Sequence, residues 1–181
     1  MNDSQPRLSF EFFPPKTPEG KEKLIKVPDQ LNEFAPDFFS VTYGAGGSTR
    51  DNTKDTVTQF VRDGVSIAPH LSFGGDDDAT INALIQDYKD AGVNRLVALR
   101  GDMPSGVGGA YQLVYANELV AYIRKHFGDH FHLEVAAYPE IHPQAKRYSD
   151  DIRYLKGKFD AGANSAITQY FFNPDSYFYF I

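Results

Sequence analysis

Glu11 is a carboxylate set within a short aromatic segment, residues 8–13, near the start of the chain. Pro14-Pro15 closes the segment, which is typical of a strand that runs into a loop. Apolar neighbours would make ionisation costly, so we predict a pKa raised into the range that suits a general acid. The alternative is a Glu on the solvated face of an alternating strand, with Phe10 and Phe12 facing inward. The segment by itself leaves both open.

Polar residues close every later strand-like segment, and they are the other candidates for chemistry. In chain order they are Thr42 and Tyr43, His70, Arg100-Gly101-Asp102, Tyr138, Glu140 and His142, and Gln169. The carboxyl ends of parallel strands meet at one edge of a sheet, where barrel enzymes place their catalytic groups. We therefore expect these side chains to form one polar surface.

Two further polar groups have plainer explanations. His130-Phe131-His132 has a spacing found in metal sites, but it lies at the entrance of a strand, the stabilising end of a barrel. We expect a solvated pair there and no metal site. Asp76-Asp77-Asp78 precedes a helical pattern, where acidic residues interact favourably with the helix dipole. No Ser stands on a G-x-S-x-G elbow, so Ser/His/Asp nucleophilic catalysis has no support.

The elements that would position these residues alternate between strand-like and helix-like stretches. Strands are predicted at residues 8–13, 38–43, 66–73, 95–99, 133–138 and 165–171. Apolar residues at helical spacing form three sets: Ile81, Leu84, Ile85 and Tyr88; Leu119, Val120, Ile123 and Phe127; and, more loosely, Ile152, Leu155 and Phe159. Thr17-Pro18-Glu19 begins a first helix, which Pro28 is expected to kink or end.

Two nearly identical segments support repeated βα units. Asp90-Ala91-Gly92-Val93-Asn94 and Asp160-Ala161-Gly162-Ala163-Asn164 each follow a helical pattern and precede a strand. Glycine at that place supplies the left-handed residue that ends a helix and turns the chain back toward the sheet. Six βα units of about 30 residues fill the chain, so we predict a single domain over residues 1–181 with a parallel sheet.

Repeated βα units fit either a doubly wound sheet or a (β/α)8 barrel. No strand is followed by a G-x-G-x-x-G or a G-x-x-x-x-G-K-[ST] loop, and the glycine-rich runs Gly44-Ala45-Gly46-Gly47 and Gly106-Val107-Gly108-Gly109 lack these spacings. Polar residues at every strand end also favour the barrel. We therefore predict an α/β fold of the (β/α)8 TIM-barrel type, of which the chain covers about six units.

Composition limits the class of protein. Hydrophobic residues make up 41%, with 15 Phe and 11 Tyr, as in a globular domain with a real core. The net charge of −6, with no Lys/Arg cluster, argues against a general nucleic-acid binder. The absence of Cys excludes disulfides and thiolate catalysis. The start has no signal-peptide pattern and no apolar run approaches membrane-spanning length, so we expect a cytoplasmic protein with no membrane partner.

Five segments resemble the methylenetetrahydrofolate reductase family, in the family's order and over nearly the whole chain. They are Phe10-Glu11-Phe12-Phe13-Pro14-Pro15-Lys16, Val41-Thr42-Tyr43-Gly44-Ala45-Gly46-Gly47, Leu99-Arg100-Gly101-Asp102, Ala137-Tyr138-Pro139-Glu140-Ile141-His142-Pro143 and Asp160-Ala161-Gly162-Ala163-Asn164-Ser165-Ala166-Ile167-Thr168-Gln169. Each is modest alone, but the set is specific. The resemblance implies a flavoprotein barrel that reduces 5,10-methylenetetrahydrofolate to 5-methyltetrahydrofolate in one-carbon and methionine metabolism.

The resemblance also implies cofactors and catalytic roles. In the implied ping-pong cycle, NAD(P)H reduces bound FAD and leaves, and the folate then takes the hydride. Glu11 matches the family's general acid, which protonates a folate nitrogen so that the five-membered ring opens. Asp102 matches a residue beside the flavin that contacts the folate pterin, and Gln169 matches one used for both folate and nicotinamide.

The family's FAD contacts carry over onto residues along most of the chain. They are Thr42, Tyr43, His70, Arg100, Gly101, Asp102, Tyr115, Ala116, Tyr138, His142, Ala145, Asp151 and Lys158. Arg100 and Lys158 suit pyrophosphate or flavin oxygens. Two positions depart from the pattern: Tyr154 stands where an Asn is usual, and Gly157 where a basic residue is usual. The lost positive charge is expected to weaken the binding of the FAD phosphates or to change the contacts that hold them.

A complete (β/α)8 barrel has two more βα units than this chain provides. We therefore expect a catalytic domain that is incomplete at the C-terminus, with the activity of these 181 residues alone in question. The alternatives are another flavin-dependent barrel oxidoreductase and an inactive remnant that acts only through protein contacts. The family's tendency to self-associate implies a homo-oligomer at full length. The lack of a regulatory domain favours NADH over NADPH.

Overall fold

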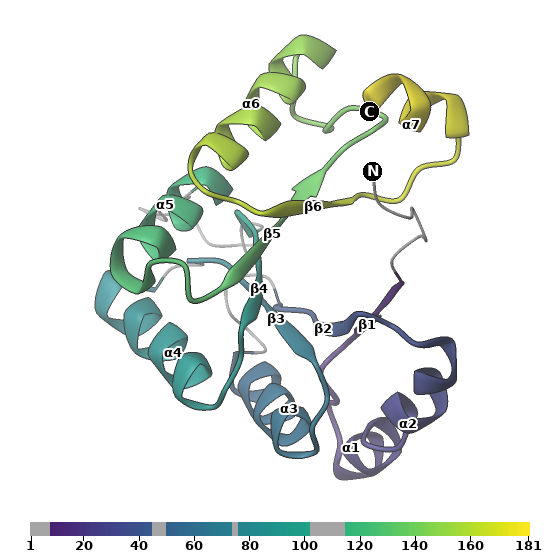
Figure 1. Cartoon of the computed structure of the whole chain (residues 1–181), viewed down its shortest axis with the longest axis vertical. Helices are drawn as coiled ribbons and strands as arrows, with labels where there is room; N and C mark the ends of the chain where they lie inside the picture. Colours follow the sequence, from purple (N-terminus) through teal and green to yellow (C-terminus); the bar gives the residue numbers. More distant parts are fainter. Residues whose placement is uncertain (1–7, 45–49, 74–75, 102–114) are drawn as a thin grey trace.

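The computed structural model describes residues 8–44, 50–73, 76–101 and 115–181, which form a curled parallel sheet with helices outside it. Figure 1 shows the strands as an arc, with α3, α4, α5 and α6 on its outer side. The strands are β1 (Ser9–Phe12), β2 (Phe38–Val41), β3 (Ile67–Leu71), β4 (Arg95–Ala98), β5 (His132–Ala137) and β6 (Ser165–Thr168). The helices are α1 (Pro18–Leu24), α2 (Val27–Leu31), the 3-10 helix η1 (Asn32–Phe34), α3 (Arg50–Arg62), α4 (Asp78–Asp90), α5 (Ala116–Phe127), α6 (Tyr148–Asp160) and α7 (Pro174–Phe180).

The six strands lie in the sheet in sequence order, and every neighbouring pair is parallel. A doubly wound sheet reverses its strand order at a switch point, and no such reversal occurs among the described strands. Sequential order, curl and outer helices are those of a partial (β/α)8 barrel, so the predicted fold class is confirmed. Strands β1 and β6 stand at the two ends of the arc.

The main hydrophobic core lies between the outer face of the sheet and the helices. Strand residues such as Val41, Leu96 and Val135 belong to one buried cluster with helix residues such as Ile85 and Ile123. In α4 and α5 these positions belong to the sets predicted from apolar spacing, so the pattern marked the core-facing side of both helices correctly. The looser set in α6 did not, because Ile152 and Phe159 are exposed and only Leu155 packs against the core. Among the described helices, none has the length and apolar character needed to cross a membrane.

Alternate strand residues face the inner side of the arc, which we call the lumen face. Phe38 of β2, Ala68 of β3 and Val97 of β4 form a second, smaller buried cluster there, and Leu99 packs against it. Side chains on this face are the ones that a barrel presents to its interior. The lumen face therefore carries both this apolar cluster and the polar groups described below.

Helix boundaries follow the capping residues expected from the sequence. Thr17 and Asp77 each accept a hydrogen bond from a backbone N–H three residues later, at the starts of α1 and α4. Pro28 lies in the first turn of α2, so the first helical stretch is divided as expected. Gly92 and Gly162 have φ angles of +96° and +113° just beyond α4 and α6. The two repeated segments thus both turn the chain into a strand through a left-handed glycine.

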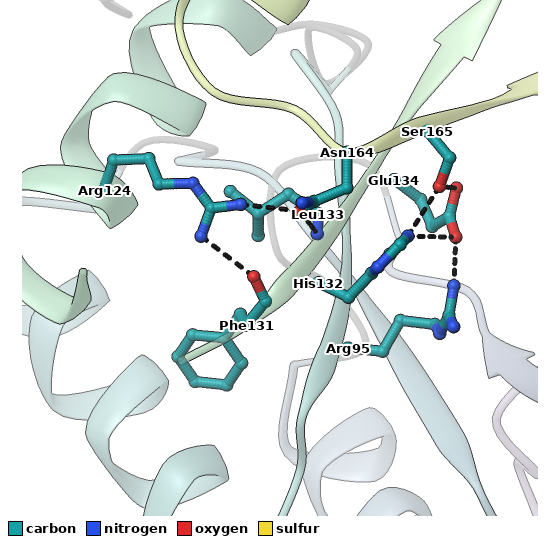
Figure 2. Close-up of polar contacts among 8 residues, drawn as sticks. All are labelled: Arg95, Arg124, Phe131, His132, Leu133, Glu134, Asn164 and Ser165. Carbon is teal, nitrogen blue, oxygen red and sulfur yellow. Dashed lines mark hydrogen bonds and ion pairs between the residues drawn. The ribbon is translucent and has the colours of Figure 1, made fainter. Parts of the chain in front are cut away.

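Buried polar groups tie together the amino ends of β4, β5 and β6 (Figure 2). The Glu134 side chain is 5% exposed, pairs with Arg95, and accepts a hydrogen bond from the Ser165 hydroxyl at 2.6 Å. Nε2 of His132 lies 2.6 Å from Ser165 Oγ and 3.3 Å from Glu134 Oε1. The Arg95 guanidinium also lies 4.4 Å from the ring centroid of Phe38. We call Arg95, His132, Glu134 and Ser165 the amino-edge network.

The expected solvated pair of histidines is only half right. His130 is exposed, with Nε2 3.1 Å from the carbonyl oxygen of Val93. His132 is partly buried and belongs to the amino-edge network, because Ser165 and Glu134 both reach it. The described residues contain no group of three or more His, Cys, Asp or Glu side chains arranged to hold a metal ion.

Arg124 of α5 provides a second polar tie at the same edge (Figure 2). It donates hydrogen bonds of 2.9 Å to the carbonyl oxygens of Phe131 and Gly162, and one of 2.6 Å to Oδ1 of Asn164. The same Asn164 oxygen accepts the backbone N–H of Leu133 at 2.7 Å. One guanidinium thereby joins α5 to the entrances of β5 and β6, where loop carbonyls would otherwise lack partners.

Candidate active site

The carboxyl edge of the sheet carries the polar residues that the sequence singled out. Thr42 follows β2, His70 lies in β3, Arg100 follows β4, Tyr138 follows β5 and Gln169 follows β6. Because all the strands are parallel, these residues lie at one edge, as predicted. This edge is opposite to the amino-edge network.

Glu11 of β1 and His70 of β3 meet across the lumen face, with Nε2 of His70 3.2 Å from Oε2 of Glu11. The strand register pairs Glu11 with Ser40 of β2, and Ser40 with Ala68 of β3. His70 therefore stands one inward-facing position further along its strand. Strands of a barrel are staggered in this way, so side chains of alternate strands share a layer. The fold brings together two residues that the sequence placed in separate segments.

The orientation of β1 decides the environment of Glu11. Phe12 is buried in the main core and stacks on Phe39 with ring centroids 5.3 Å apart, whereas the Glu11 side chain is 52% exposed. The close polar contact with His70 lowers the pKa of Glu11, burial acts against it, and attraction to a charged imidazole lowers it further. The predicted rise in pKa is therefore wrong. The aromatic neighbours pack on the opposite face of the strand, and the group beside the carboxylate is an imidazole.

A second polar cluster lies beyond the ends of β4 and β5. Nη1 of Arg100 donates to Oε1 of Gln144 at 2.6 Å, and the Gln144 backbone N–H donates to Nδ1 of His142 at 3.0 Å. The His142 backbone N–H donates to Oδ2 of the buried Asp151 at 3.0 Å. Tyr138 packs edge-on against the His142 ring, with centroids 4.5 Å apart. Four predicted cofactor residues are thus gathered in one place.

Lys158 reaches the same cluster from the last turn of α6. Its Nζ donates to the carbonyl oxygen of Ala136 at 2.7 Å and lies 5.8 Å from the ring centroid of Tyr138. Burial lowers the pKa of Lys158, Asp151 acts against this by favouring the charged form, and the Arg100 cation adds to the lowering. Two cations beside one buried carboxylate give a region of positive potential. Such a region suits an anionic group such as a phosphate.

Gly101, directly after Arg100, cannot carry a side chain without displacing its neighbours. Its φ angle is +78°, and a Cβ atom there would lie 2.6 Å from Oγ and 2.9 Å from Cβ of the buried Ser72. The ends of β3 and β4 therefore approach closely only because this residue is glycine. Asp102, the next predicted site residue, lies outside the described residues, as does the rest of the segment 102–114.

Thr42 and Tyr43 continue β2 toward α3. The carbonyl oxygen of Thr42 accepts a hydrogen bond from the hydroxyl of Thr53 at 2.9 Å, which ties the strand end to the helix. Tyr43 is partly buried and packs against the main core. The backbone at this point is therefore held by α3, and the Thr42 hydroxyl stands at the carboxyl edge.

Three further predicted cofactor residues lie near the starts of α5 and α6. The backbone N–H of Tyr115, the N-terminal cap residue of α5, donates to Oε2 of Glu118 at 2.7 Å, and Ala116 is buried in the first turn. Ala145 donates its backbone N–H to the carbonyl oxygen of His142 at 2.9 Å, in the loop before α6. Helix starts present unpaired N–H groups that attract anions.

Gln169 lies at the carboxyl edge, but its side chain is turned toward its own backbone. Oε1 accepts the N–H of Tyr170 at 2.9 Å, and among the described contacts no hydrogen bond or ion pair joins it to Glu11. Glu140, which the sequence also singled out, accepts the backbone N–H groups of Phe172 and Asn173 at 3.1 and 2.9 Å. Its role in this structure is to fix the segment between β6 and α7.

The two departures from the family pattern both lie on α6. Tyr154 is exposed, with the Arg153 guanidinium 5.6 Å from its ring centroid. Gly157 has no atom within 4 Å of where a Cβ would stand, and its φ angle is not positive. A larger residue would therefore fit at position 157 without displacing its surroundings.

Sequence reasoning missed Ser72 and Gln144. Ser72 is the residue against which Gly101 packs, and Gln144 is the partner of Arg100. Gln144 lies two residues after His142, in a loop that the sequence had already marked as part of the site, so its position could have suggested a role. Nothing in the sequence connects Ser72 with Gly101, because their contact depends on the close approach of β3 and β4.

A family model described as Methylenetetrahydrofolate reductase matches residues 1–181. A 5,10-methylenetetrahydrofolate reductase of Pectobacterium carotovorum subsp. carotovorum is 45% identical over 174 residues, which are 96% of this chain and 57% of that protein. The protein of that name from Escherichia coli (strain K12) is 44% identical over 177 residues, 97% of this chain and 58% of that protein. A Zea mays relative, "Methylenetetrahydrofolate reductase (NADH) 1", is 37% identical over 193 residues, 99% of this chain and 32% of that protein. The chain spans just over half the length of these bacterial relatives.

Solved structures with the same fold include enzymes of other kinds. Deoxyribose phosphate aldolase from Aeropyrum pernix superposes with a TM-score of 0.57 at 14% identity, covering 90% of this chain and 62% of that chain. An oxaloacetate acetylhydrolase gives 0.58 at 14% identity, covering 83% and 57%. At such low identity the similarity concerns the fold alone.

Proposed function

The chain belongs to the methylenetetrahydrofolate reductase family, and we propose that the protein carrying it reduces 5,10-methylenetetrahydrofolate to 5-methyltetrahydrofolate. One observation carries the proposal beyond family membership. The carboxyl edge of one barrel holds both a carboxylate beside a buried imidazole and a cationic cluster around Arg100 and Lys158. The first can handle a proton and the second can hold an anionic cofactor.

The residues of the cationic cluster fit FAD. Arg100 and Lys158 offer charge-assisted hydrogen bonds to a pyrophosphate, and Tyr138 and His142 offer aromatic surface beside them. Gly101 lets the end of β4 lie close against Ser72, which fixes the backbone beside this cluster. FAD, when bound, supplies a hydride carrier between NAD(P)H and the folate. Thr42, Tyr43, His70, Tyr115, Ala116, Ala145, Asp151 and, outside the described residues, Asp102 complete the proposed cofactor contacts.

Glu11 would deliver the proton that opens the five-membered folate ring. It lies on the lumen face, half exposed, where a substrate at the carboxyl edge could cover it. Covering the carboxylate removes water and makes its charge more costly, which favours uptake of a proton. Gln169 and Asp102 would orient the folate and the nicotinamide. For Gln169 this requires that the side chain leave its contact with Tyr170.

NADH is the hydride donor that we favour, and the name of the maize relative, which specifies NADH, supports this choice. We also propose a cytoplasmic location, as expected from the sequence patterns, and a homo-oligomer, as the family resemblance implied. These assignments concern the full-length protein, because this chain spans just over half the length of its bacterial relatives.

The test is a turnover assay on the full-length protein that carries this sequence. Purified protein should show the visible absorbance bands of bound FAD and should form 5-methyltetrahydrofolate from NADH and 5,10-methylenetetrahydrofolate. NADPH in place of NADH should give slower turnover. A protein that binds FAD and oxidises NADH but leaves the folate unchanged would be a different flavin-dependent oxidoreductase, and the proposal would be wrong.

A further inference from the structure

We propose that Glu11 and His70 act as one proton-holding pair, in which the His70 imidazole stores the proton that Glu11 passes to the substrate. The inference rests on the proposed folate reduction and adds His70 as a residue that acts through Glu11. It gives His70 a task besides contact with the cofactor.

The geometry supports a shared proton. Nε2 of His70 is buried and makes no aligned hydrogen bond among the described residues, and Oε2 of Glu11, 3.2 Å away, is its ion-pair partner. The imidazole is held in the sheet, whereas the Glu11 side chain is 52% exposed toward the lumen. One member of the pair is therefore fixed and shielded from water, and the other faces the space that a substrate would occupy.

The described residues around the pair offer little else that could hold the proton. At this level β2 presents the neutral Ser40 opposite Glu11, and β4 presents the neutral Val97 opposite His70. His70 is the one titratable group among the described residues that perturbs the Glu11 carboxyl, whose pKa it lowers. A carboxyl group with a lowered pKa is ionised at neutral pH and carries no proton of its own to donate. A second site for the proton is therefore required.

The proposed transfer has two steps that balance. The N–H bond at His70 Nε2 breaks as an O–H bond forms at Glu11 Oε2, which leaves a neutral imidazole and a neutral carboxylic acid. The Glu11 O–H bond then breaks as the lone pair of the folate nitrogen takes the proton, and the carboxylate is restored. Solvent returns one proton to the pair after the product leaves.

Two substitutions of His70 separate proton storage from simple positioning. His70→Gln keeps a hydrogen-bond donor near Glu11 but cannot hold an exchangeable proton in this way, and His70→Leu removes both functions. In the full-length protein, both variants should lose about 10²-fold in the rate at which methylenetetrahydrofolate reoxidises the reduced enzyme, the usual contribution of a placed acid. If His70→Gln keeps a rate close to that of the wild type while His70→Leu does not, His70 only positions Glu11 and the proposal fails.

A double substitution separates the pair from cofactor binding. If Glu11 and His70 act as a unit, Glu11→Gln combined with His70→Gln should be no slower in the folate step than the slower single variant. Losses that multiply would mean that His70 acts independently, through FAD, and would overturn the pair. His126→Gln, an exposed histidine of α5 far from the pair in the fold, is the matched control and should keep the wild-type rate.

A titration without the cofactor gives a readout that does not depend on activity. The carboxyl carbon of Glu11 can be followed by NMR in the FAD-free full-length protein and assigned from its loss in Glu11→Gln. His70→Leu should move the midpoint of this titration upward, and His126→Gln should leave it in place. An unmoved midpoint in His70→Leu would overturn the pair whatever the activity. A moved midpoint in a protein that does not reduce the folate would instead contradict the proposed function, and with it the proton delivery that depends on it.

Discussion

Arg95 of β4 forms an ion pair with Glu134 of β5 at the amino edge of the sheet, where the Glu134 side chain is almost fully buried. The two strands are paired so that Arg95 stands opposite His132, and Arg95 reaches Glu134 diagonally. Ser165 of β6 and His132 complete the contacts of the carboxylate. The charged groups of this edge therefore hold three strands together, and those of the opposite edge remain available for ligands.

Removing Arg95 alone should be costly, because it leaves the Glu134 carboxylate buried without its cation. We expect Arg95→Met to reduce the free energy of unfolding by about 3–5 kcal/mol. The double variant Arg95→Met with Glu134→Leu should lose clearly less than Arg95→Met alone, since no buried charge is then left unpaired. Urea unfolding of the wild type, the single variants Arg95→Met and Glu134→Leu, and the double variant measures this. Additive losses would mean that the two side chains are not coupled.

Replacing Gly157 should stabilise the protein. The position is inside α6, has free space around a new Cβ, and has no positive φ angle, so Gly157→Ala should gain about 0.5–1 kcal/mol from helix propensity. Gly162→Ala is the matched contrast, because its φ is +113° and its Cβ would lie 2.9 Å from Cγ of Arg124. Arg124 cannot move aside freely since it is held by four hydrogen bonds. Thermal unfolding should shift up for the first variant and down for the second, and equal shifts would contradict the account.

Gly101→Ala tests the close approach of β3 and β4 at the carboxyl edge. The substitution adds a left-handed alanine, which costs about 1–2 kcal/mol, and a contact of 2.6 Å with Ser72 Oγ. Gly64→Ala has nearly the same φ, +77°, but no atom within 4 Å of its Cβ, so it carries only the first cost. The Gly101 variant should therefore be the less stable of the two and should bind FAD more weakly in a fluorescence titration. Equal stability and wild-type FAD affinity would show that Ser72 moves aside without consequence.

The Glu11–His70 contact should also make stability depend on pH in the acid range. The folded-state pKa of Glu11 lies below its ordinary value of 4.5, chiefly because of the close polar contact with His70. Such a carboxyl group adds stability that is fully present above its unfolded pKa and is lost as the pH falls through the folded pKa. The stability difference between wild type and Glu11→Gln should therefore shrink below pH 4.5. In a His70→Leu background, urea unfolding should show no such acid dependence, and its persistence would mean that another group lowers the pKa.

Much of the fold follows from local patterns in the sequence. The apolar spacing in α4 and α5 marked the helix faces that enter the core, and Gly92 and Gly162 marked the turns into β4 and β6. The strand ends were predicted a few residues too long, because apolar residues such as Phe13 and Leu99 continue the strand-like pattern beyond the last paired residue. Polar residues at strand ends also predicted the carboxyl edge correctly, since parallel strands bring such residues to one side.

The errors concern contacts between distant segments. The environment of Glu11 was misjudged because the aromatic side chains of β1 face the helices, and because the stagger of the sheet brings His70 to its carboxylate. His132 was expected in solvent, but Glu134 on the same strand and Ser165 on the next enclose it. Neither relationship is visible in a single sequence, where strand register and stagger have no signature.

We propose that the carboxyl edge of the full-length barrel reduces a folate with Glu11 as the proton donor. The most direct measurement is the anaerobic reoxidation of the reduced full-length protein by 5,10-methylenetetrahydrofolate, followed by flavin absorbance in wild type and Glu11→Gln. We predict that the wild type is reoxidised and forms 5-methyltetrahydrofolate, and that Glu11→Gln is slower by about 10²-fold or more. Reduction by NADH should be affected far less. Reoxidation of Glu11→Gln at the wild-type rate would contradict the account.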